Sequence, residues 1–259
     1  SDTSAVALAA ALGAERCDIY TDVDGVYTTD PRIVEKAQKL DKVSYEEMLE
    51  MASLGAKVLQ TRSVEVAMIH KVRTQVLSSF DESAGENLPG TLVCDEDEIM
   101  EKRLVTGVAY SRDEAKITLV RVPDRPGVAA SIFSPLADAG INVDMIVQNV
   151  SDDGKTTDMT FTTGKADFDR ALKVLEDNRA AIGFERISTD PNVVKVSVIG
   201  VGMRTHAGVA QTMFKTLAEK GINIQVISTS EIKVSVLIAA EYTELAVRAL
   251  HTAYGLDKA

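Results

Sequence analysis

The chain has 259 residues, 45% of them hydrophobic, a length that suits two or three domains with sizeable cores. Its net charge of -11 argues against a nucleic-acid partner, which needs clustered lysine and arginine. The sequence shows neither an apolar run long enough for a membrane span nor a secretory signal at its start. Two distant cysteines and three isolated histidines predict no metal site, no histidine-based triad and a reducing, cytoplasmic setting.

The first 80 residues alternate between helical and strand patterns. We expect, in chain order, a helix over 3–12, a strand over 16–23, a polar loop over 24–32, a helix from Ser44, a helix over 56–70 and a strand over 74–80. Ser44 precedes Glu46 and Glu47, which is typical of a capped helix start. Glycine, proline, asparagine and acidic residues crowd 81–100, which predicts a domain linker there.

The rest of the chain contains a repeat. With an offset of 81 residues, nine of the seventeen positions over 127–143 are identical in the second copy, where chance gives about one. The repeat therefore indicates two duplicated modules.

Each copy reads as strand, helix, two strands and helix, with Gly140 or Gly221 at the left-handed position that ends the first helix. The first copy has a strand at each end, over 115–122 and 183–189. The second copy opens with a strand over 194–201 but has no strand after its second helix. A strand over 103–110 is left to complete the second module, so the first module is inserted within it. Two helices on one face of a four-stranded antiparallel sheet form a ferredoxin-like arrangement.

In both copies a loop runs directly into a helix N-terminus, through "VPDRPGVAA" and "MRTHAGVAQ". Free N–H groups and the helix dipole favour a carboxylate there. Asn142 and Asn223 open the next strands, with Gln148, or Ser230 and Glu231, further along. These groups suit a zwitterionic amino acid, although glycine and asparagine that merely form turns would leave the same pattern.

The repeat resembles paired ACT domains, and "DIYTDVDGVYTTDPR" with "SYEEMLEMASLGAKVL" resembles the C-terminal part of the aspartate kinase catalytic domain. Together with "VQNVS", "VSVIGVGM" and "ISTSEIKVSVLI", the resemblance to the aspartate kinase family covers essentially the whole chain. It implies a partial amino-acid kinase fold of the α/β class, followed by two ferredoxin-like α+β ACT domains. The implied domains are 1–90 for the kinase part, 112–190 for the first ACT domain and 101–111 plus 191–259 for the second.

The resemblance implies that ATP, with Mg²⁺, phosphorylates the side-chain carboxylate of L-aspartate to give 4-phospho-L-aspartate. This step opens the route to lysine (through diaminopimelate), threonine and methionine. The residues that match ATP contacts of the family are Thr21, Asp22, Tyr27, Arg32 and Lys57, and Ser1 matches a residue that binds aspartate. An arginine and a lysine suit phosphoryl transfer, which depends mainly on positioning and charge stabilisation.

The ACT domains imply allosteric feedback inhibition by L-lysine, L-threonine or both, with modules of two chains pairing around the effectors. The expected partners are a second copy of the chain or a short subunit made of ACT domains alone. In the first module the matching effector contacts are Asp124, Arg125, Pro126, Gly127, Val128, Ala129, Asn142, Val143, Asp144 and Gln148. In the second module they are Val209, Ala210, Asn223, Ile224, Ser230 and Glu231.

Two departures from the family pattern qualify these expectations. The N-terminal "KFGG"-type motif with the catalytic lysine is absent, so we expect an N-terminally truncated chain with no catalytic residue and no kinase activity of its own. His206 stands where the first copy has Arg125, which predicts two pockets that are not equivalent. The alternative reading is a non-catalytic regulatory ACT subunit, for which Met100 is a suitable internal start; a stand-alone sensor would not need "VDGVYTTDPR".

Overall fold

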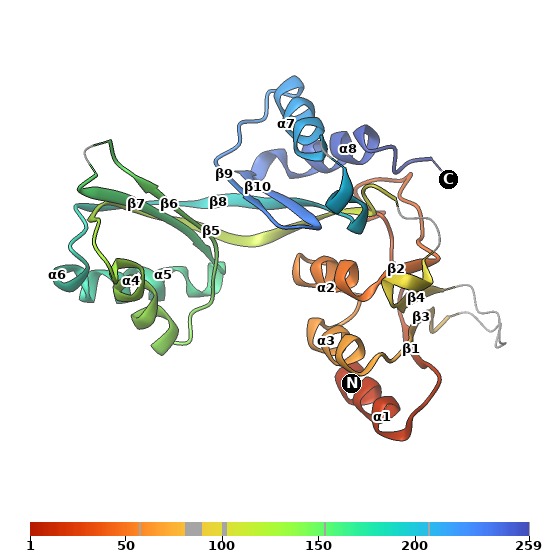
Figure 1. The fold of residues 1–259 in the computed structure, drawn as a ribbon. Coiled ribbons are helices and arrows are strands. Elements are labelled where there is room, and N and C mark those ends of the chain that lie inside the picture. The colour runs from red at the N-terminus through yellow and green to blue at the C-terminus, as the bar shows by residue number, and fades with distance from the viewer. Residues whose placement is uncertain (57, 81–89, 100–102, 153, 207, 259) are drawn as a thin grey trace.

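The N-terminal unit is a four-stranded sheet with three helices beside it in the computed structural model, which describes residues 1–56, 58–80, 90–99, 103–152, 154–206 and 208–258 (Figure 1). The sheet has the order β1-β3-β4-β2; β1 and β3 are parallel, as are β2 and β4, and β3 and β4 are antiparallel. Its strands are β1 (Cys17–Thr21), β2 (Lys42–Ser44), β3 (Thr74–Ser78) and β4 (Thr91–Cys94). The helices are α1 (Asp2–Leu12), α2 (Tyr45–Ser53) and α3 (Thr61–His70). The predicted alternation of helices and strands is thus confirmed.

The start of α2 shows why the sequence folds as predicted there. The hydroxyl of Ser44 accepts a hydrogen bond from the Glu47 amide, and the Glu47 carboxylate accepts one from the Ser44 amide, both at 3.2 Å. This reciprocal capping box satisfies two amides that a helix start otherwise leaves without partners.

Two predictions for the N-terminal unit are corrected. The helix expected over 56–70 begins only at Thr61, because Gln60 is extended and acts as its N-cap residue. The second half of the linker expected over 81–100 is occupied by β4 and by the short helix η1 (Glu96–Glu98); the first half, 81–89, lies outside the described residues. The buried run Thr91–Cys94 completes the first sheet, so this sheet extends past the predicted boundary at residue 90.

The remainder of the chain forms one six-stranded antiparallel sheet of order β6-β7-β5-β8-β10-β9. Its strands are β5 (Gly107–Pro123), β6 (Val143–Val150), β7 (Thr156–Thr163), β8 (Arg186–Ile199), β9 (Val226–Thr229) and β10 (Lys233–Ala239). The helices are α4 (Val128–Asp138), α5 (Phe168–Asp177), α6 (Arg179–Ile182), α7 (Val209–Glu219) and α8 (Thr243–Ala253), with the short helices η2 (Lys165–Asp167), η3 (Val201–Thr205) and η4 (Ala240–Tyr242).

Two long strands, β5 and β8, run through both modules. The sequence predicts separate strands over 103–110 and 115–122 and over 183–189 and 194–201, but each pair is one continuous strand. The polar residues between them do not end the strands, because register shifts near Ser111 and Glu114 absorb the irregularity. Residues 107–111 pair with 195–199, whereas 116–120 pair with 186–190, so the predicted domain boundaries fall inside shared strands.

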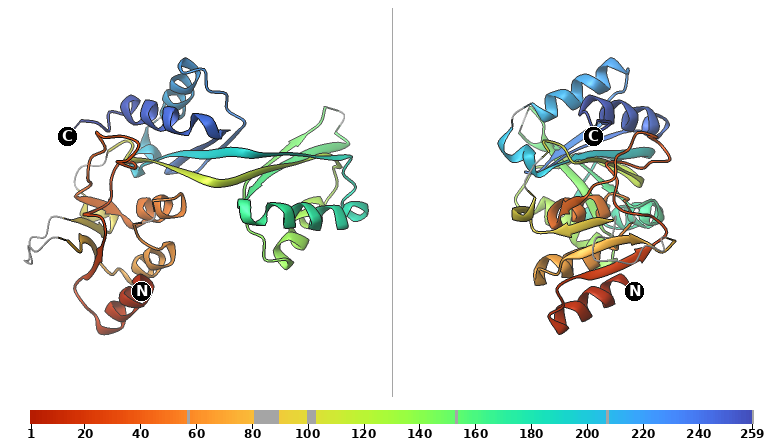
Figure 2. Two further views of the ribbon diagram at one scale, coloured as in Figure 1. Left: turned by 180° about the vertical axis from the view of Figure 1, so that it is seen from behind. Right: turned by 90° about the vertical axis from the view of Figure 1, so that its right-hand side faces the viewer.

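The helices of the two modules lie on opposite faces and towards opposite ends of this sheet. Figures 1 and 2 show α4, α5 and α6 on one side of β5–β8 and α7 and α8 on the other. Each helix layer covers its own hydrophobic core, one built around Phe161 and Leu136 and the other around Met213 and Val236. The left-handed glycines expected after α4 and α7 are confirmed, since Gly140 and Gly221 both have φ of 68°.

The N-terminal unit packs against the second module on the face opposite α7 and α8. Successive residues of a strand point to opposite faces. Val108 and Val198 accordingly enter the core under α7 and α8, whereas Ala109 and Ile199 enter the core of the N-terminal unit. Gly107 lies where an added Cβ would come within 2.9 Å of the Thr28 carbonyl oxygen, so only glycine allows this approach. Within the described part of the chain, no helix is both long and apolar enough to cross a bilayer.

Candidate functional site

The loop predicted to hold ATP leaves the first sheet at the end of β1. The Thr21 hydroxyl donates to the Asp22 carboxylate at 3.3 Å. Asp24 accepts a hydrogen bond from the Tyr27 hydroxyl at 2.9 Å and pairs with Lys39 at 3.1 Å. Burial raises the pKa of Asp24, but the hydrogen bonds from Tyr27 and Lys39 outweigh it and leave this pKa below its usual value. The base of the loop therefore holds an ionised carboxylate between a phenol and an ammonium group.

Arg32 lies near the far end of the loop, with 88% of its side chain exposed. Its Nε and Nη2 atoms donate to the two carboxylate oxygens of Asp30 at 3.0 and 2.9 Å. These hydrogen bonds lower the pKa of Asp30, which stays ionised and orients the guanidinium. An oriented, exposed guanidinium suits the oxygens of a phosphate group.

The other predicted substrate and nucleotide residues are Ser1 and Lys57. Ser1 is the exposed N-cap residue of α1, and its hydroxyl donates to Asp2 at 3.2 Å. The other Asp2 oxygen accepts from the Gln60 amide at 3.4 Å, which brings Ser1 beside the start of α3. Lys57 lies outside the described residues.

The first module has an open hollow of about 410 Å³ at the N-terminus of α4, here called the first-module hollow. It is lined by Asp124, Arg125, Pro126, Gly127, Val128, Ala129 and Gln148. All seven residues belong to the predicted effector contacts. The chain thus brings the loop before α4 together with Gln148 of strand β6, which lies about 20 residues further along.

The local geometry of the hollow follows from its sequence. Gly127 is the N-cap residue of α4 with φ of 89°, a conformation that side chains disfavour. Arg125 donates from Nη2 to the Ala181 carbonyl at 3.1 Å, which ties the loop to α6. A cationic side chain, a helix N-terminus and an amide therefore face one hollow, a combination that suits a carboxylate.

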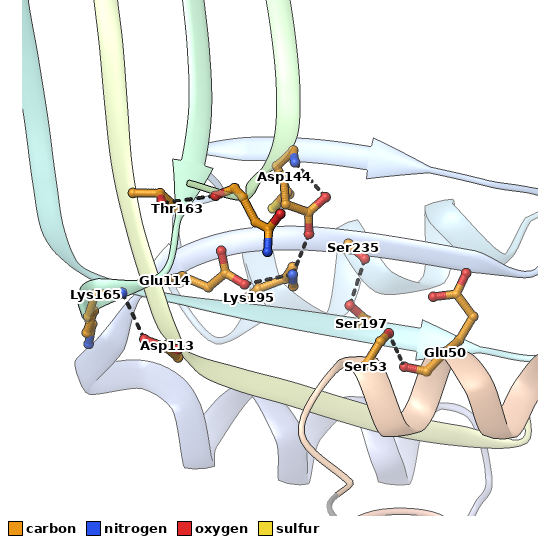
Figure 3. A network of polar contacts seen from close by, with 12 residues as sticks. Glu50, Ser53, Asp113, Glu114, Asp144, Thr163, Lys165, Lys195, Ser197 and Ser235 are labelled. Atoms are coloured by element: carbon orange, nitrogen blue, oxygen red, sulfur yellow. Dashed lines mark hydrogen bonds and ion pairs between the residues drawn. The ribbon is translucent and has the colours of Figure 1, made fainter. Parts of the chain in front are cut away.

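Asn142, Val143 and Asp144 lie at the start of β6 and do not line the hollow. Asp144 instead pairs with Lys195 of β8 at 2.6 Å, and Lys195 also pairs with Glu114 of β5 at 2.7 Å (Figure 3). Burial raises the pKa of Asp144, yet its contacts with Lys195 dominate and lower it. Gln148 therefore lines the hollow, whereas Asp144, at the start of the same strand, lies at the junction of the two modules.

The six predicted contacts of the second module lie on three elements. Val209 and Ala210 begin α7, after Gly208 with φ of 103°; Asn223 and Ile224 follow α7; Ser230 and Glu231 form the turn between β9 and β10. The Tyr254 hydroxyl donates to the Val209 carbonyl at 2.7 Å. Glu231 lies 3.6 Å from Arg204 of η3, so η3 joins the turn to the loop that precedes α7.

The two equivalent loop positions, Arg125 and His206, make different contacts. His206 Nδ1 lies 2.9 Å from the Thr205 hydroxyl and 3.0 Å from the Gly202 carbonyl oxygen, within its own loop. Arg125, by contrast, reaches a different element and borders the first-module hollow. Equivalent positions in the repeat are therefore used differently.

Sequence reasoning missed Lys39 and Lys195. Lys195 pairs with Asp144, a predicted effector contact, and Lys39 pairs with Asp24, which also accepts a hydrogen bond from the predicted Tyr27. Lys195 is only 6% exposed and interrupts the apolar run "VVKVSVI", and a lysine within such a run was the available signal. Lys39 has no comparable signal, because its partner Asp24 is 15 residues away across the loop.

Comparisons with known proteins agree with this architecture. The amino acid kinase family matches residues 1–78, and ACT domain families match 116–180 and 196–254. An aspartate kinase of Stutzerimonas stutzeri is 59% identical over 258 residues, which are 99% of this chain and 61% of that protein. The chain thus spans about three-fifths of the length of this relative.

Solved structures give the same result. The aspartokinase alpha and beta subunits include a chain 52% identical to this one, with a TM-score of 0.55, over 58% of this chain and 99% of the other. E. coli aspartokinase III, solved with aspartate and ADP in its R-state, is 32% identical, with a TM-score of 0.80, over 97% of this chain and 55% of its own. Its T-state, solved with lysine and aspartate, has a TM-score of 0.75 at 31% identity over 97% of this chain and 54% of its own. This chain has an amino-acid kinase segment and two ACT domains, and together with these matches they show that it belongs to the aspartate kinase (aspartokinase) family.

Proposed function

We propose that the protein containing this chain is a cytoplasmic aspartate kinase that makes 4-phospho-L-aspartate, at the entry to lysine, threonine and methionine synthesis. The side-chain carboxylate of L-aspartate attacks the γ-phosphorus of ATP, the bond from this phosphorus to the bridging oxygen breaks, and ADP leaves. The match to an aspartate kinase over 99% of the chain is the observation that carries this proposal.

The residues of this chain contribute binding and charge to the proposed reaction. Phosphoryl transfer depends mainly on positioning and on neutralising the phosphate oxygens. Arg32 offers an exposed guanidinium held by Asp30, and Lys39 offers an ammonium group at the base of the same loop. Mg²⁺ is typically held by substrate phosphates and one or two carboxylates, so it would enter with ATP, and exposed Asp22 is the carboxylate best placed to meet it.

We propose further that the first-module hollow binds L-lysine or L-threonine as a feedback inhibitor. The effector carboxylate would lie at the N-terminus of α4 beside Arg125, and the amide of Gln148 would accept from or donate to its polar groups. Support comes from the hollow itself and from the lysine complex of E. coli aspartokinase III.

The activity is tested on the product of the complete reading frame that contains these 259 residues. ADP release should require L-aspartate, and it should fall when L-lysine, L-threonine or both are added. L-glutamate serves as the control substrate, since it differs from aspartate by one methylene group. ADP release that is indifferent to L-aspartate would contradict the proposal.

The effector site is tested on the chain itself by calorimetric titration with L-lysine and L-threonine, separately and together. Saturable binding of one amino acid that tightens the binding of the other is expected for two coupled sites. A folded chain that binds neither would remove the regulatory half of the proposal and leave the catalytic half intact.

A second candidate is a non-catalytic subunit made from the ACT region alone, which would assemble with the longer chain. The favouring observation is the chain of the aspartokinase alpha and beta subunits that matches 58% of this chain over 99% of its own length. The internal start predicted at Met100 lies outside the described residues. Replacing the Met100 codon and probing the native source for a shorter product tests this candidate.

A further inference from the structure

The loop between β1 and β2 is attached at two places that belong to different parts of the molecule. We call residues 24–34 the nucleotide loop. Its base is bound to the first sheet: the Val26 amide donates to the Thr91 hydroxyl at 2.8 Å, and the Leu40 amide donates to the Val26 carbonyl at 2.8 Å. Beyond Val26 the chain rises away from this sheet towards β5 and α8 (Figures 1 and 2).

The far part of the nucleotide loop is held by the second ACT module. The Thr28 carbonyl accepts from the Val108 amide at 2.7 Å, and the Thr28 hydroxyl lies 2.9 Å from His251 Nε2. Both Thr28 and His251 are fully buried, with exposed fractions of 1% and 0%. A contact of this kind is fixed by packing, because neither group can exchange it for water.

Two further contacts lie on either side of Arg32. The Tyr110 hydroxyl of β5 donates to Asp30 at 3.1 Å, on the same carboxylate that orients the Arg32 guanidinium. Arg248 of α8 donates from Nε to the Ile33 carbonyl at 2.9 Å. The side chains of Ile33 and Val34 pack against the core beneath α7 and α8.

From these contacts we infer that Tyr110, Arg248 and His251 are positioning residues for the nucleotide loop, so that the second ACT module sets the geometry of the ATP site. The inference rests on the proposed function, because it takes Arg32 and its loop to meet the nucleotide. The three residues do not touch ATP themselves; they act through Asp30, Ile33 and Thr28. A shift of α8 or β5 would therefore move Arg32 directly, without passing through the first sheet.

The first arm of the test measures amide hydrogen exchange in the chain carrying Tyr110→Phe and Arg248→Gln. Tyr110→Phe removes the hydroxyl that donates to Asp30, and Arg248→Gln removes the guanidinium that donates to Ile33 and also pairs with Glu244. The Arg248 side chain is 56% exposed, so the fold should persist. Exchange of peptides covering 26–36 should accelerate by about 5- to 30-fold, since each lost hydrogen bond contributes about 1 kcal/mol. Peptides from β1 and β3 should be unchanged. The matched control carries Tyr242→Phe and Arg170→Gln, the same chemical changes away from the loop.

The second arm measures kinetics of the same variants in the product of the complete reading frame. The KM for ATP should rise by about 5- to 30-fold while the KM for L-aspartate stays within about twofold. Unchanged exchange over 26–36 would overturn the inference outright. Faster exchange with an unchanged KM for ATP would overturn the positioning role while the kinase proposal stands. A wild-type product without aspartate-dependent turnover would overturn the proposed function instead, and exchange would still decide whether the second module holds the loop.

Discussion

The two ACT modules share a fold and differ in what surrounds them. Both first helices start at a left-handed glycine, with φ of 89° at Gly127 and 103° at Gly208, and both are followed by a glycine with φ of 68°. The loop before α4 opens into the first-module hollow. The loop before α7 is joined through η3 to the N-terminal unit, because the Val201 amide donates to buried Glu47 at 2.9 Å. The two copies thus have the same fold, but in the described part of the chain the N-terminal unit packs only against the sheet of the second copy.

This difference teaches that equivalent positions in a duplicated sequence need not have equivalent roles. We propose that the first module mainly receives the effector and that the second mainly transmits its presence to the nucleotide loop. The Lys195 cluster joins the two, since Lys195 of β8 pairs with Glu114 of β5 and with Asp144 of β6.

The largest expected effect comes from Glu47, which, among the described residues, the second module contacts and the first does not, and whose Oε2 atom also closes the capping box with Ser44. Its Oε1 atom accepts from the Thr106 hydroxyl at 2.6 Å and from the Val201 amide at 2.9 Å. Glu47→Ala leaves these buried donors without an acceptor, so the free energy of unfolding should fall by about 3 kcal/mol. Urea denaturation measures this loss. The control is Glu176→Ala, which breaks the exposed ion pair with Arg179 in the first module and should lower the free energy of unfolding by less than about 0.5 kcal/mol. Equal losses would contradict the role of Glu47 at this interface.

Binding at the hollow should depend on Arg125 and not on its counterpart. Arg125→Ala should weaken the affinity for the effector found by calorimetry about 10- to 100-fold, because it removes a charge-assisted contact to the carboxylate. His206→Ala, at the equivalent position of the second loop, should change this affinity less than twofold in the same titration, about 0.4 kcal/mol or less. If the two variants weakened binding alike, the proposed division between the modules would be wrong.

Equivalent core substitutions in the two modules should lower the free energy of unfolding by amounts that differ by about 1 kcal/mol. Phe133 packs edge-on against Phe161, with ring centroids 5.3 Å apart. Phe214, the equivalent residue, packs against the second core, and no such ring pair involves it in the part of the chain that the structure describes. Phe133→Leu should therefore destabilise the protein by about 1 kcal/mol more than Phe214→Leu, measured by thermal and urea unfolding. The reverse order would show that shape, rather than the aromatic pair, decides the cost.

The last expected effect is a pH dependence of stability near neutral pH, to which, of the two modules, only the second can contribute through histidine, since no histidine lies within 112–190. Burial lowers the pKa of His251, and the nearby Asp257 only partly opposes this. The unfolded chain therefore takes up the proton first, so this contribution is complete above the ordinary pKa of about 6.5 and is lost as the pH falls below it. The loss approaches about 1.4 kcal/mol per pH unit at most. Urea unfolding at pH 7.5 and 5.5 should show this loss of unfolding free energy in the wild type and not in His251→Gln. An identical pH dependence in the two proteins would contradict the prediction.

The sequence predicted most of the local structure because local chemistry decides it. Ser44 and Glu47 lie three residues apart and form the predicted cap, and Gly140 and Gly221 take the predicted conformation. The first effector loop and Gln148 were matched through family resemblance, and the structure brings them to one hollow.

What the sequence did not predict depends on residues far apart in the chain. Tyr110 meets Asp30 across 80 residues, and His251 meets Thr28 across 223 residues, and no periodicity records either contact. The continuous β5 was also missed, because polar Ser111–Asp113 look like a break in the sequence, whereas the structure carries the strand through them by a register shift between Ser111 and Glu114, both of which pair with β8. The sequence also did not predict the ion pair of Asp144, which the resemblance places among the effector contacts, because its partner Lys195 lies 51 residues away.

The shared strands also dictate an order of events during synthesis. Residues 107–111 leave the ribosome more than 80 residues before 195–199, with which they pair, a delay of about 4–20 s at ordinary translation rates. In the meantime the inserted first module can complete its own sheet, and doing so brings 186–190 beside 116–120. That pairing shortens the remaining loop to a few residues, and closing a short loop costs much less entropy than closing a long one. A lesion in the first module, such as Phe133→Leu, should therefore slow the assembly of the second module, although no residue of the second module has changed.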